Sequence, residues 1–235
     1  MKKIAIVGGG AAGLTAAITA ATTGSAVELF EQNSRVGKKI LASGNGRCNI
    51  SNTRLSRNDY YGEDPSFVDY TLEQFDFKQF EKFCHSIGLL LNSKEDGRTY
   101  PLSDEARSVV LALESYARTL GVIFHNEKAV NRIEKEGETF YVSSGETRFE
   151  GYDRVLICTG SEAAPQLGGN GDGYTLSLLP APNARTDSRT IRSVESTISS
   201  GSSSGCSMRC SSRRAAVAPS SYACCAMTVR KGSER

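Results

Sequence analysis

The sequence predicts an α/β protein with a parallel central sheet, a three-stranded antiparallel insertion and a disordered C-terminal tail. A short continuous apolar run at residues 4–7 is typical of a buried parallel strand. A glycine cluster and a helical apolar pattern follow this run directly, and a second strand pattern covers residues 26–30. Beyond residue 176 the apolar periodicity ends, which favours a tail over a further folded unit.

Composition excludes some classes of protein. The 235 residues can bury a sizeable core, and the formal net charge is only +2, so we expect no nucleic-acid partner. No apolar run approaches the roughly 18 residues that a membrane-spanning helix needs. The strand pattern begins at Ile4, where a signal peptide would carry its charged and apolar regions, so we expect a cytoplasmic protein.

The glycine cluster forms a G-x-G-x-x-G motif between the first strand and a helix that we expect at about residues 11–23. The first glycine permits a tight turn, the second lets a pyrophosphate approach the backbone, and the third lets the helix pack close to the strand. The first-turn N–H groups of the helix are free to hold a phosphate. The expected dinucleotide contacts are Gly8, Gly10, Ala11, Ala12 and Gly13.

An acidic residue closes the second strand. Glu31 lies 18 residues after Gly13, where a carboxylate can accept both ribose hydroxyls of an adenosine. A 2′-phosphate would require an arginine instead. Strand, glycines, helix, strand and acid in this order predict a Rossmann-like dinucleotide-binding domain, and we include the neighbouring Gln32 among its contacts.

A second motif, GKKILASGNGRCNISNT at residues 37–53, predicts a long polar loop after the second strand. Lys38, Lys39 and Arg47 supply positive charge, and backbone amides around Gly44 and Gly46 can form an anion-binding nest. A solvated basic loop is the alternative. The candidate contacts here are Lys38, Ser43, Gly44, Gly46, Arg47, Cys48 and Asn49.

This loop resembles the signature of a bacterial family of FAD-dependent flavoproteins, described as aminoacetone oxidase-like or bile-acid 3-dehydro-4,6-reductase-like. Residues 97–103 (GRTYPLS) are similar to the family's G-R-x-[FY]-P-x-S stretch. Residues 155–160 (VLICTG) resemble its strand ending in A-T-G, with cysteine for alanine, and residues 165–174 (PQLGGNGDGY) resemble its P-x-x-G-x-x-G-D-G-Y. The resemblance spans about residues 3–176.

The resemblance implies FAD as cofactor and flavin-mediated hydride or electron transfer to an unknown small molecule, with NAD(P)H as a candidate electron donor. It also implies that the backbone of Val130 faces the adenine and that Thr159 and Gly160 contact the cofactor. The family continues with a mainly β substrate domain and a return to the first domain. Nothing similar follows Leu176, so residues 1–176 are expected to be an incomplete FAD-binding domain.

The middle of the chain predicts further elements of this fold. A capping pattern at Asp76 and Gln79 begins an amphipathic helix that Gly88 ends, and Ser103 caps a helix that runs to about Leu120. The remaining predictions are a hairpin turning at residues 95–97, a third parallel strand at 122–124, three antiparallel strands at 129–135, 139–142 and 147–150, and a returning strand at 155–158.

The sequence identifies no catalytic residue and no metal site. His85 and His125 are expected to be structural. Disulfide reductases carry a cysteine partner five residues beyond the place of Cys48, and Thr53 stands there instead. We therefore expect Cys48 to be a small loop residue near the flavin.

The last 59 residues, 177–235, differ in composition from the rest. They hold 15 serines and nine basic against three acidic residues. We expect a low-complexity, disordered tail whose lost periodicity resembles translation in a shifted reading frame. The alternatives are a basic arm for nucleic acid, a zinc site built from four cysteines, and an ordinary linker.

Two other functions stay open beside the flavoprotein oxidoreductase. An NAD-dependent enzyme is compatible with Glu31 but leaves residues 43–49 without a task. A non-enzyme, either an inactive truncated remnant or a nucleotide-binding module, is compatible with the missing substrate domain.

Overall fold

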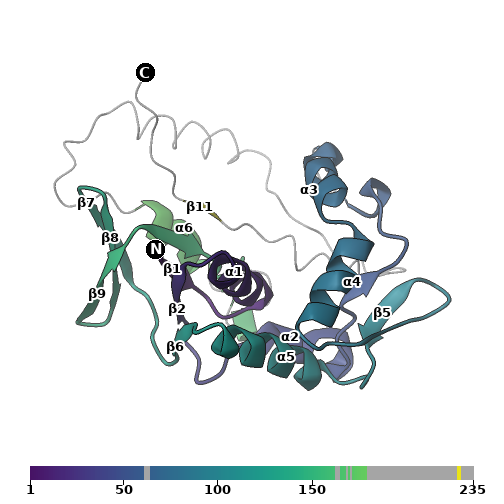
Figure 1. Ribbon diagram of the computed structural model, residues 1–235. Coiled ribbons are helices and arrows are strands. Elements are labelled where there is room, and N and C mark those ends of the chain that lie inside the picture. The colour runs from purple at the N-terminus through teal and green to yellow at the C-terminus, as the bar shows by residue number, and fades with distance from the viewer. Residues whose placement is uncertain (61–63, 162–164, 168, 170, 179–226, 229–235) are drawn as a thin grey trace.

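A computed structural model describes residues 1–60, 64–161, 165–167, 169, 171–178 and 227–228. They fold around a five-stranded sheet of order β11-β10-β1-β2-β6 (Figure 1). Four of its strands are parallel, which confirms the predicted α/β class with a parallel central sheet. The strands are β1 (Lys3–Val7), β2 (Ala26–Phe30), β6 (Ile123–His125), β10 (Arg154–Ile157) and the antiparallel β11 (Met227–Thr228).

Two helices cover one face of this sheet, α1 (Ala11–Thr22) and α5 (Ala106–Thr119). Successive side chains of a strand point to opposite faces. Ile6 therefore packs toward the helices, while Ala5 and Val7 face the other side. The apolar spacing of three and four residues predicts a buried stripe on α5, which Ala106, Val109, Val110, Leu113 and Ala117 form. The helix α1 ends one residue earlier than expected.

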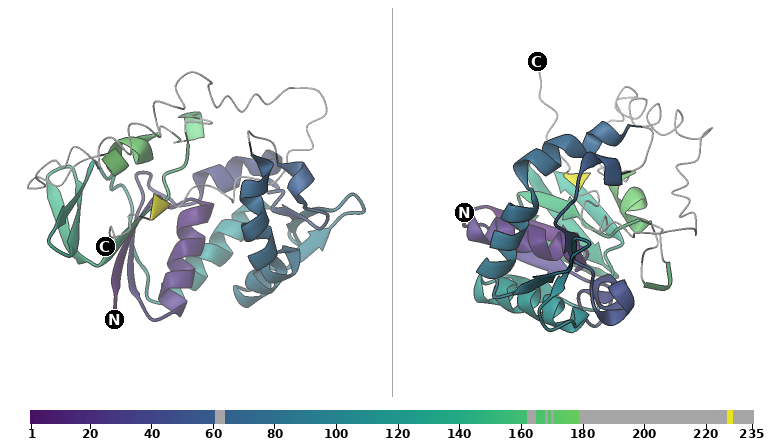
Figure 2. Two further views of the ribbon diagram at one scale, coloured as in Figure 1. Left: turned by 90° about the horizontal axis from the view of Figure 1, so that it is seen from above. Right: turned by 90° about the vertical axis from the view of Figure 1, so that its right-hand side faces the viewer.

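The other face carries the predicted antiparallel sheet, made of β7 (Arg132–Glu136), β8 (Thr139–Ser144) and β9 (Thr147–Tyr152). This sheet lies at one end of the molecule, and α3 (Asp69–Gln74), α4 (Phe77–Ser86) and β5 (Arg98–Pro101) lie at the other (Figures 1 and 2). Its inward side chains form a second core with Phe30 and with Leu176 of α6 (Asp172–Leu178).

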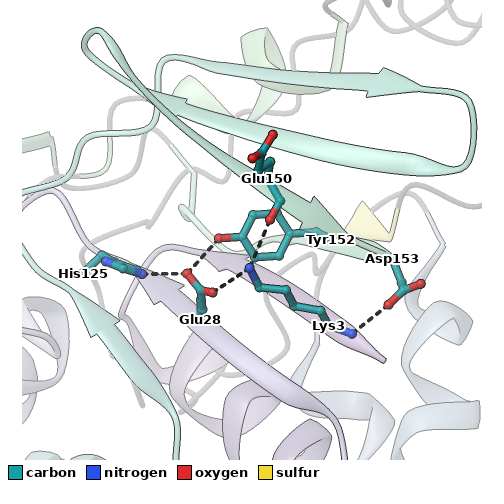
Figure 3. A network of polar contacts seen from close by, with 6 residues as sticks. All are labelled: Lys3, Glu28, His125, Glu150, Tyr152 and Asp153. Carbon is teal, nitrogen blue, oxygen red and sulfur yellow. Dashed lines mark hydrogen bonds and ion pairs between the residues drawn. The ribbon is translucent and has the colours of Figure 1, made fainter. Parts of the chain in front are cut away.

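A polar network joins the antiparallel sheet to the central one (Figure 3). The carboxylate of Glu28 on β2 lies 2.9 Å from Lys3 Nζ and 2.7 Å from His125 Nε2, and it accepts a 2.8 Å bond from the Tyr152 hydroxyl. Burial opposes ionisation of Glu28, but these three partners outweigh it and hold its pKa below the ordinary value. Lys3 also donates to the Glu150 carbonyl and to Asp153.

The segment between β2 and α5 departs from the predicted long polar loop. It contains α2 (Lys38–Ala42), η1 (Ser43–Gly46) and the short strand β3 (Ser51–Asn52). The helix forms because Gly37 is left-handed at φ 77° and Ile40 enters the core, neither of which a five-residue pattern reveals. The further elements are η2 (Arg57–Asp59), η3 (Pro65–Val68), α3 (Asp69–Gln74), α4 (Phe77–Ser86), β4 (Leu91–Ser93), β5 (Arg98–Pro101) and η4 (Pro165–Leu167).

One predicted cap is right and one is wrong. The Asp76 carboxylate accepts from the Gln79 N–H at 3.0 Å and caps α4. Ser103 does not cap α5, whose N-cap is Glu105. The helix begins later because the intervening Asp104 is left-handed, at φ 58°, and so cannot belong to the first turn.

The predicted disordered tail falls almost wholly on residues 179–226 and 229–235, which lie outside the described residues. The described part of the chain contains no helix that combines the length and apolar character of a membrane span. Its histidine, cysteine and acidic side chains form no group able to hold a metal ion.

Candidate cofactor site

The glycine motif lies where the connections of the central sheet reverse direction. The chain leaves β1, crosses through α1 to β2 on one side, and later returns to β10 on the other side of β1. In open α/β sheets, ligands bind outside the carboxyl ends of the strands at such a point. The turn from β1 into α1 is therefore the candidate site.

Three glycines of this turn are required by the protein itself. A Cβ on Gly8 would lie 2.5 Å from the Cys158 carbonyl oxygen, and φ there is 106°. A Cβ on Gly13 would lie 1.9 Å from the Gly8 carbonyl oxygen. Gly9, a variable position in the motif, is also enclosed, because its Cβ would meet Val36 at 2.6 Å. These glycines let strand, turn and helix pack together.

Gly10 is different from these glycines. A Cβ built there meets nothing within 4 Å, and its φ of −81° suits any residue. Gly10 is the N-cap of α1 and offers no side-chain cap to the first-turn N–H groups. Open space beside uncapped, partly positive N–H groups is what a pyrophosphate requires, so these residues fit a dinucleotide.

Glu31 lies against this turn but is already engaged. Its side chain accepts from the Gly9 N–H at 2.8 Å through Oε2. Its Oε1 accepts from the backbone N–H of Asn33 at 2.8 Å and from Asn33 Nδ2 at 2.6 Å. The residue is buried, with 8% of its surface exposed. The carboxylate is thus at the expected edge, with most of its accepting capacity in use.

The loop after β10 borders the same turn. The Cα of Thr159 would lie 3.0 Å from a Cβ on Gly8, and Thr159 Oγ1 is a buried oxygen without a hydrogen-bond partner in the described structure. A Cβ on Gly160 would lie 3.2 Å from Lys39 Nζ, so α2 brings this ammonium beside the loop. The structure thereby groups Gly8, Thr159 and Gly160 with Lys39, whereas the predicted contact Lys38 is exposed.

The second motif forms a tight turn after α2. Gly44, Asn45 and Gly46 all have left-handed φ, at 55°, 55° and 82°. A Cβ on Gly44 would lie 2.8 Å from the Asn49 backbone nitrogen, whereas Gly46 faces open space. The predicted anion nest stays a prediction. Cys48 is fully buried in the core between the central sheet and helices α1 and α5. Its thiol therefore does not face a ligand, and only its backbone can contact one.

Arg47 is held on the outer side of this turn. Its Nε donates to Asp104 Oδ2 at 2.7 Å, and its guanidinium lies 5.0 Å from the centre of the Tyr100 ring. The bond to Asp104 raises the pKa of Arg47, which therefore stays cationic. The Asn49 amide, oriented as its neighbours require, reaches the carbonyl oxygens of Thr99 and Ser51.

The remaining candidates are scattered. Gln32 and Lys38 are exposed, Ser43 is half-buried, and the Val130 side chain lies in the second core. His85 is exposed and His125 stacks on Phe30 at 4.6 Å, so His125 has the structural role we expected. Sequence reasoning missed residues that act through others: Gly9, Asn33, Gly37, Tyr100 and Asp104.

The match to a family model decides the assignment. Residues 2–179 match the model described as the HI0933-like protein Rossmann domain. The chain belongs to the HI0933-like family. Proteins of this family are FAD-dependent flavoprotein oxidoreductases, and FAD is the cofactor of their Rossmann domain. The resemblance inferred from the second motif is therefore confirmed.

Curated relatives match the same region. The chain is 39% identical over 178 residues to a 3-dehydro-bile acid delta(4,6)-reductase of Clostridium scindens, covering 75% of this chain and 43% of that protein. It is 28% identical over 175 residues to a ribosomal RNA dihydrouridine synthase of Haemophilus influenzae, covering 73% of this chain and 43% of that protein. The HI0933-like chain thus spans less than half the length of these relatives.

A solved structure shares the fold. It is a 3-ketosteroid-delta4-(5alpha)-dehydrogenase from Rhodococcus jostii in complex with 4-androstene-3,17-dione. The TM-score is 0.50 at 16% identity, over 68% of this chain and 46% of that chain. At this identity the likeness concerns the fold alone.

Proposed function

We propose that this chain is the FAD-binding part of a reductase that saturates a carbon–carbon double bond conjugated to a carbonyl group. The names of the relatives support this reading. A 3-dehydro-bile acid with delta(4,6) double bonds and the uracil ring both contain such a conjugated bond, and both names denote its reduction. We further propose NAD(P)H as the electron donor, and a cytoplasmic location stays a prediction.

The residues have distinct tasks in this proposal. FAD, when bound, supplies the hydride chemistry, and the protein supplies position and charge. The first turn of α1 and the open face of Gly10 hold the pyrophosphate, and Glu31 binds the adenosine ribose. Lys39, beside Gly160, adds positive charge near the anionic cofactor. Thr159 and Gly160, in the loop that borders the glycine turn, are the further cofactor contacts of this proposal.

The observation that carries the proposal is the open space at Gly10. A Cβ at this position meets no protein atom within 4 Å, so Gly10→Val should fill the space and exclude the pyrophosphate while the fold persists. We expect the Kd for FAD to rise at least about tenfold, which corresponds to about 1.4 kcal/mol. Titration with FAD, followed by flavin fluorescence, measures this Kd, and the Tm in the absence of FAD reports the fold.

Thr19→Val is the matched control, because it places the same side chain on an exposed position of the same helix, two turns from the N-terminus. It should bind FAD like the unmodified chain. An unchanged Kd in Gly10→Val would contradict our placement of the phosphate. Stronger competition by NAD than by FAD at this site would instead favour an NAD-dependent enzyme.

Substrate choice is tested with the FAD-loaded chain. NADH or NADPH oxidation is followed with a 3-oxo-4,6-diene steroid and, separately, with a short uridine-containing RNA. Any turnover should be with the steroid rather than with RNA, because the steroid-reducing relative is 39% identical to this chain and the RNA-modifying relative is 28% identical. Turnover with the RNA but not with the steroid would show that the substrate is a uridine-containing RNA instead of a steroid. FAD binding without turnover of either substrate would favour a nucleotide-binding module or an inactive remnant.

A further inference from the structure

Asn33 makes two hydrogen bonds to the side chain of Glu31, the residue predicted to bind the adenosine ribose. Its backbone N–H and its Nδ2 both donate to Glu31 Oε1, at 2.8 Å and 2.6 Å. The other carboxylate oxygen accepts from Gly9 at 2.8 Å. Three donors therefore fix the orientation of a buried carboxylate at the edge of the candidate site.

The turn that carries Asn33 is itself anchored to the loop after β6. The Asn33 carbonyl accepts from the Glu127 N–H at 3.1 Å, and the Glu31 carbonyl accepts from the Lys128 N–H at 2.9 Å. Asn126 Nδ2 donates to the Ser34 carbonyl at 3.2 Å. Because the backbone is held on both sides, the Asn33 amide meets Glu31 from a defined position.

We propose that Asn33 is the positioning residue for the adenosine-ribose contact, acting by holding the carboxylate of Glu31. The inference rests on the proposed assignment of Glu31 to the ribose. An ionised carboxylate offers about four acceptor positions, and Gly9 and Asn33 use three of them. Glu31 thus has room for about one ribose hydroxyl rather than the two expected from the sequence.

This arrangement predicts how nucleotides are discriminated. A donor removed from Glu31 lets the carboxylate rotate or turn to solvent, so selectivity for a ribose hydroxyl should fall even if the turn stays folded. A purely structural Asn33 would change stability and leave selectivity intact. The useful readout is therefore a ratio of affinities, which global destabilisation does not change.

The test uses the full chain, with ADP, 2′-deoxy-ADP and 3′-deoxy-ADP as competitors of FAD. We expect the unmodified chain to prefer ADP over one of the deoxy forms by about tenfold, since a hydrogen bond to a charged group is worth about 1.5–3 kcal/mol. Glu31→Gln and Asn33→Ala should each reduce this preference to about twofold or less. The double variant should show no further loss, because both residues act on one contact.

Asn126→Ala is the matched control, since it removes an asparagine support of the same turn without touching Glu31. It should keep the ADP preference. If Asn33→Ala does not fold, Asn33→Leu replaces it, because leucine is similar in size and shape and carries no donor.

The outcomes separate the two claims. An unchanged preference in Glu31→Gln would overturn the ribose assignment and the inference together. Loss of preference in Glu31→Gln, with the unmodified value in Asn33→Ala or Asn33→Leu, would overturn the role of Asn33 alone. Equal losses in Asn33→Ala and Asn126→Ala would show that folding of the turn, rather than the amide of Asn33, sets the contact.

Discussion

The glycines of the motif look equivalent in the sequence, but different physical constraints require them. Gly8 and Gly13 are set by contacts within the protein, where a Cβ would lie within 2.5 Å of a carbonyl oxygen. Gly10 is set by space that the protein leaves open. A residue-by-residue test therefore distinguishes glycines required for folding from one required for the ligand.

Gly13→Ala should destabilise the chain by about 3 kcal/mol. Alanine favours the helix over glycine by about 1 kcal/mol, but the new Cβ would lie 1.9 Å from the Gly8 carbonyl oxygen and must displace the turn. Urea unfolding in the absence of FAD measures this loss. Gly10→Ala is the control and should unfold like the unmodified chain; a similar loss in both variants would contradict the distinction.

At the scale of elements, β2 organises both faces of the molecule. Val27 and Leu29 pack against the helices, and Glu28 and Phe30 face the antiparallel sheet. Glu28 places a carboxylate in this interface, and the carboxylate contacts one residue each of strands β1, β6 and β9 (Figure 3). Burial, followed by the bond to Glu28, raises the pKa of Tyr152, so this hydroxyl stays protonated and donates.

Glu28→Gln should lower the free energy of unfolding at pH 7 by about 1–3 kcal/mol, because three donors lose a charged acceptor. The pKa of Glu28 is lowered in the folded state, so its contribution is full above the unfolded pKa near 4.5 and is lost as pH falls through the folded value. Urea unfolding at pH 7 and at several values below 4.5 should show the two chains converging in acid.

Glu134→Gln is a control of equal exposure. Both glutamate side chains are 13% exposed, but the ion pair of Glu134 is with Arg132 alone among the described residues, and that arginine is half exposed. Its loss should be under about 1 kcal/mol, as for other surface pairs. Equal losses in Glu28→Gln and Glu134→Gln would show that the network contributes no more than one surface ion pair.

At the scale of the whole molecule, two cores share one sheet, and the candidate cofactor site lies at the sheet's carboxyl edge between them. The glycine turn contacts β2 through Phe30, α2 through Gly37 and β10 through Cys158. A ligand bound at this turn is therefore linked through the turn to elements from both halves of the described chain, and its binding energy should stabilise the whole fold.

FAD at about 100 times its Kd should stabilise the chain by about 2.7 kcal/mol. A thermal or urea unfolding series at increasing FAD concentration checks the expected logarithmic dependence. The same series with Gly10→Val should show little stabilisation at equal concentration. Identical stabilisation of both chains would place FAD away from this turn.

Local signals in the sequence were sufficient to predict several elements of the fold. The apolar runs predicted β1, β2 and β10 to within about a residue, and the apolar stripe of α5 and the hairpin turn at Gly97 followed from periodicity and turn chemistry. Side chains a few residues apart share one face or one turn, so their pattern is visible in the sequence. The family signature at residues 37–53 allowed FAD to be predicted as the cofactor.

The contacts between these elements became visible in the three-dimensional structure. Tyr152 bonds to Glu28 across 124 positions, and Arg47 to Asp104 across 57. The structure also showed that α2 is a helix, that the thiol of Cys48 is buried, and that Asn33 holds the carboxylate expected to bind the ribose. A carboxylate's partners depend on which strands pair and which loops meet, and no local pattern encodes a contact between segments far apart in the chain.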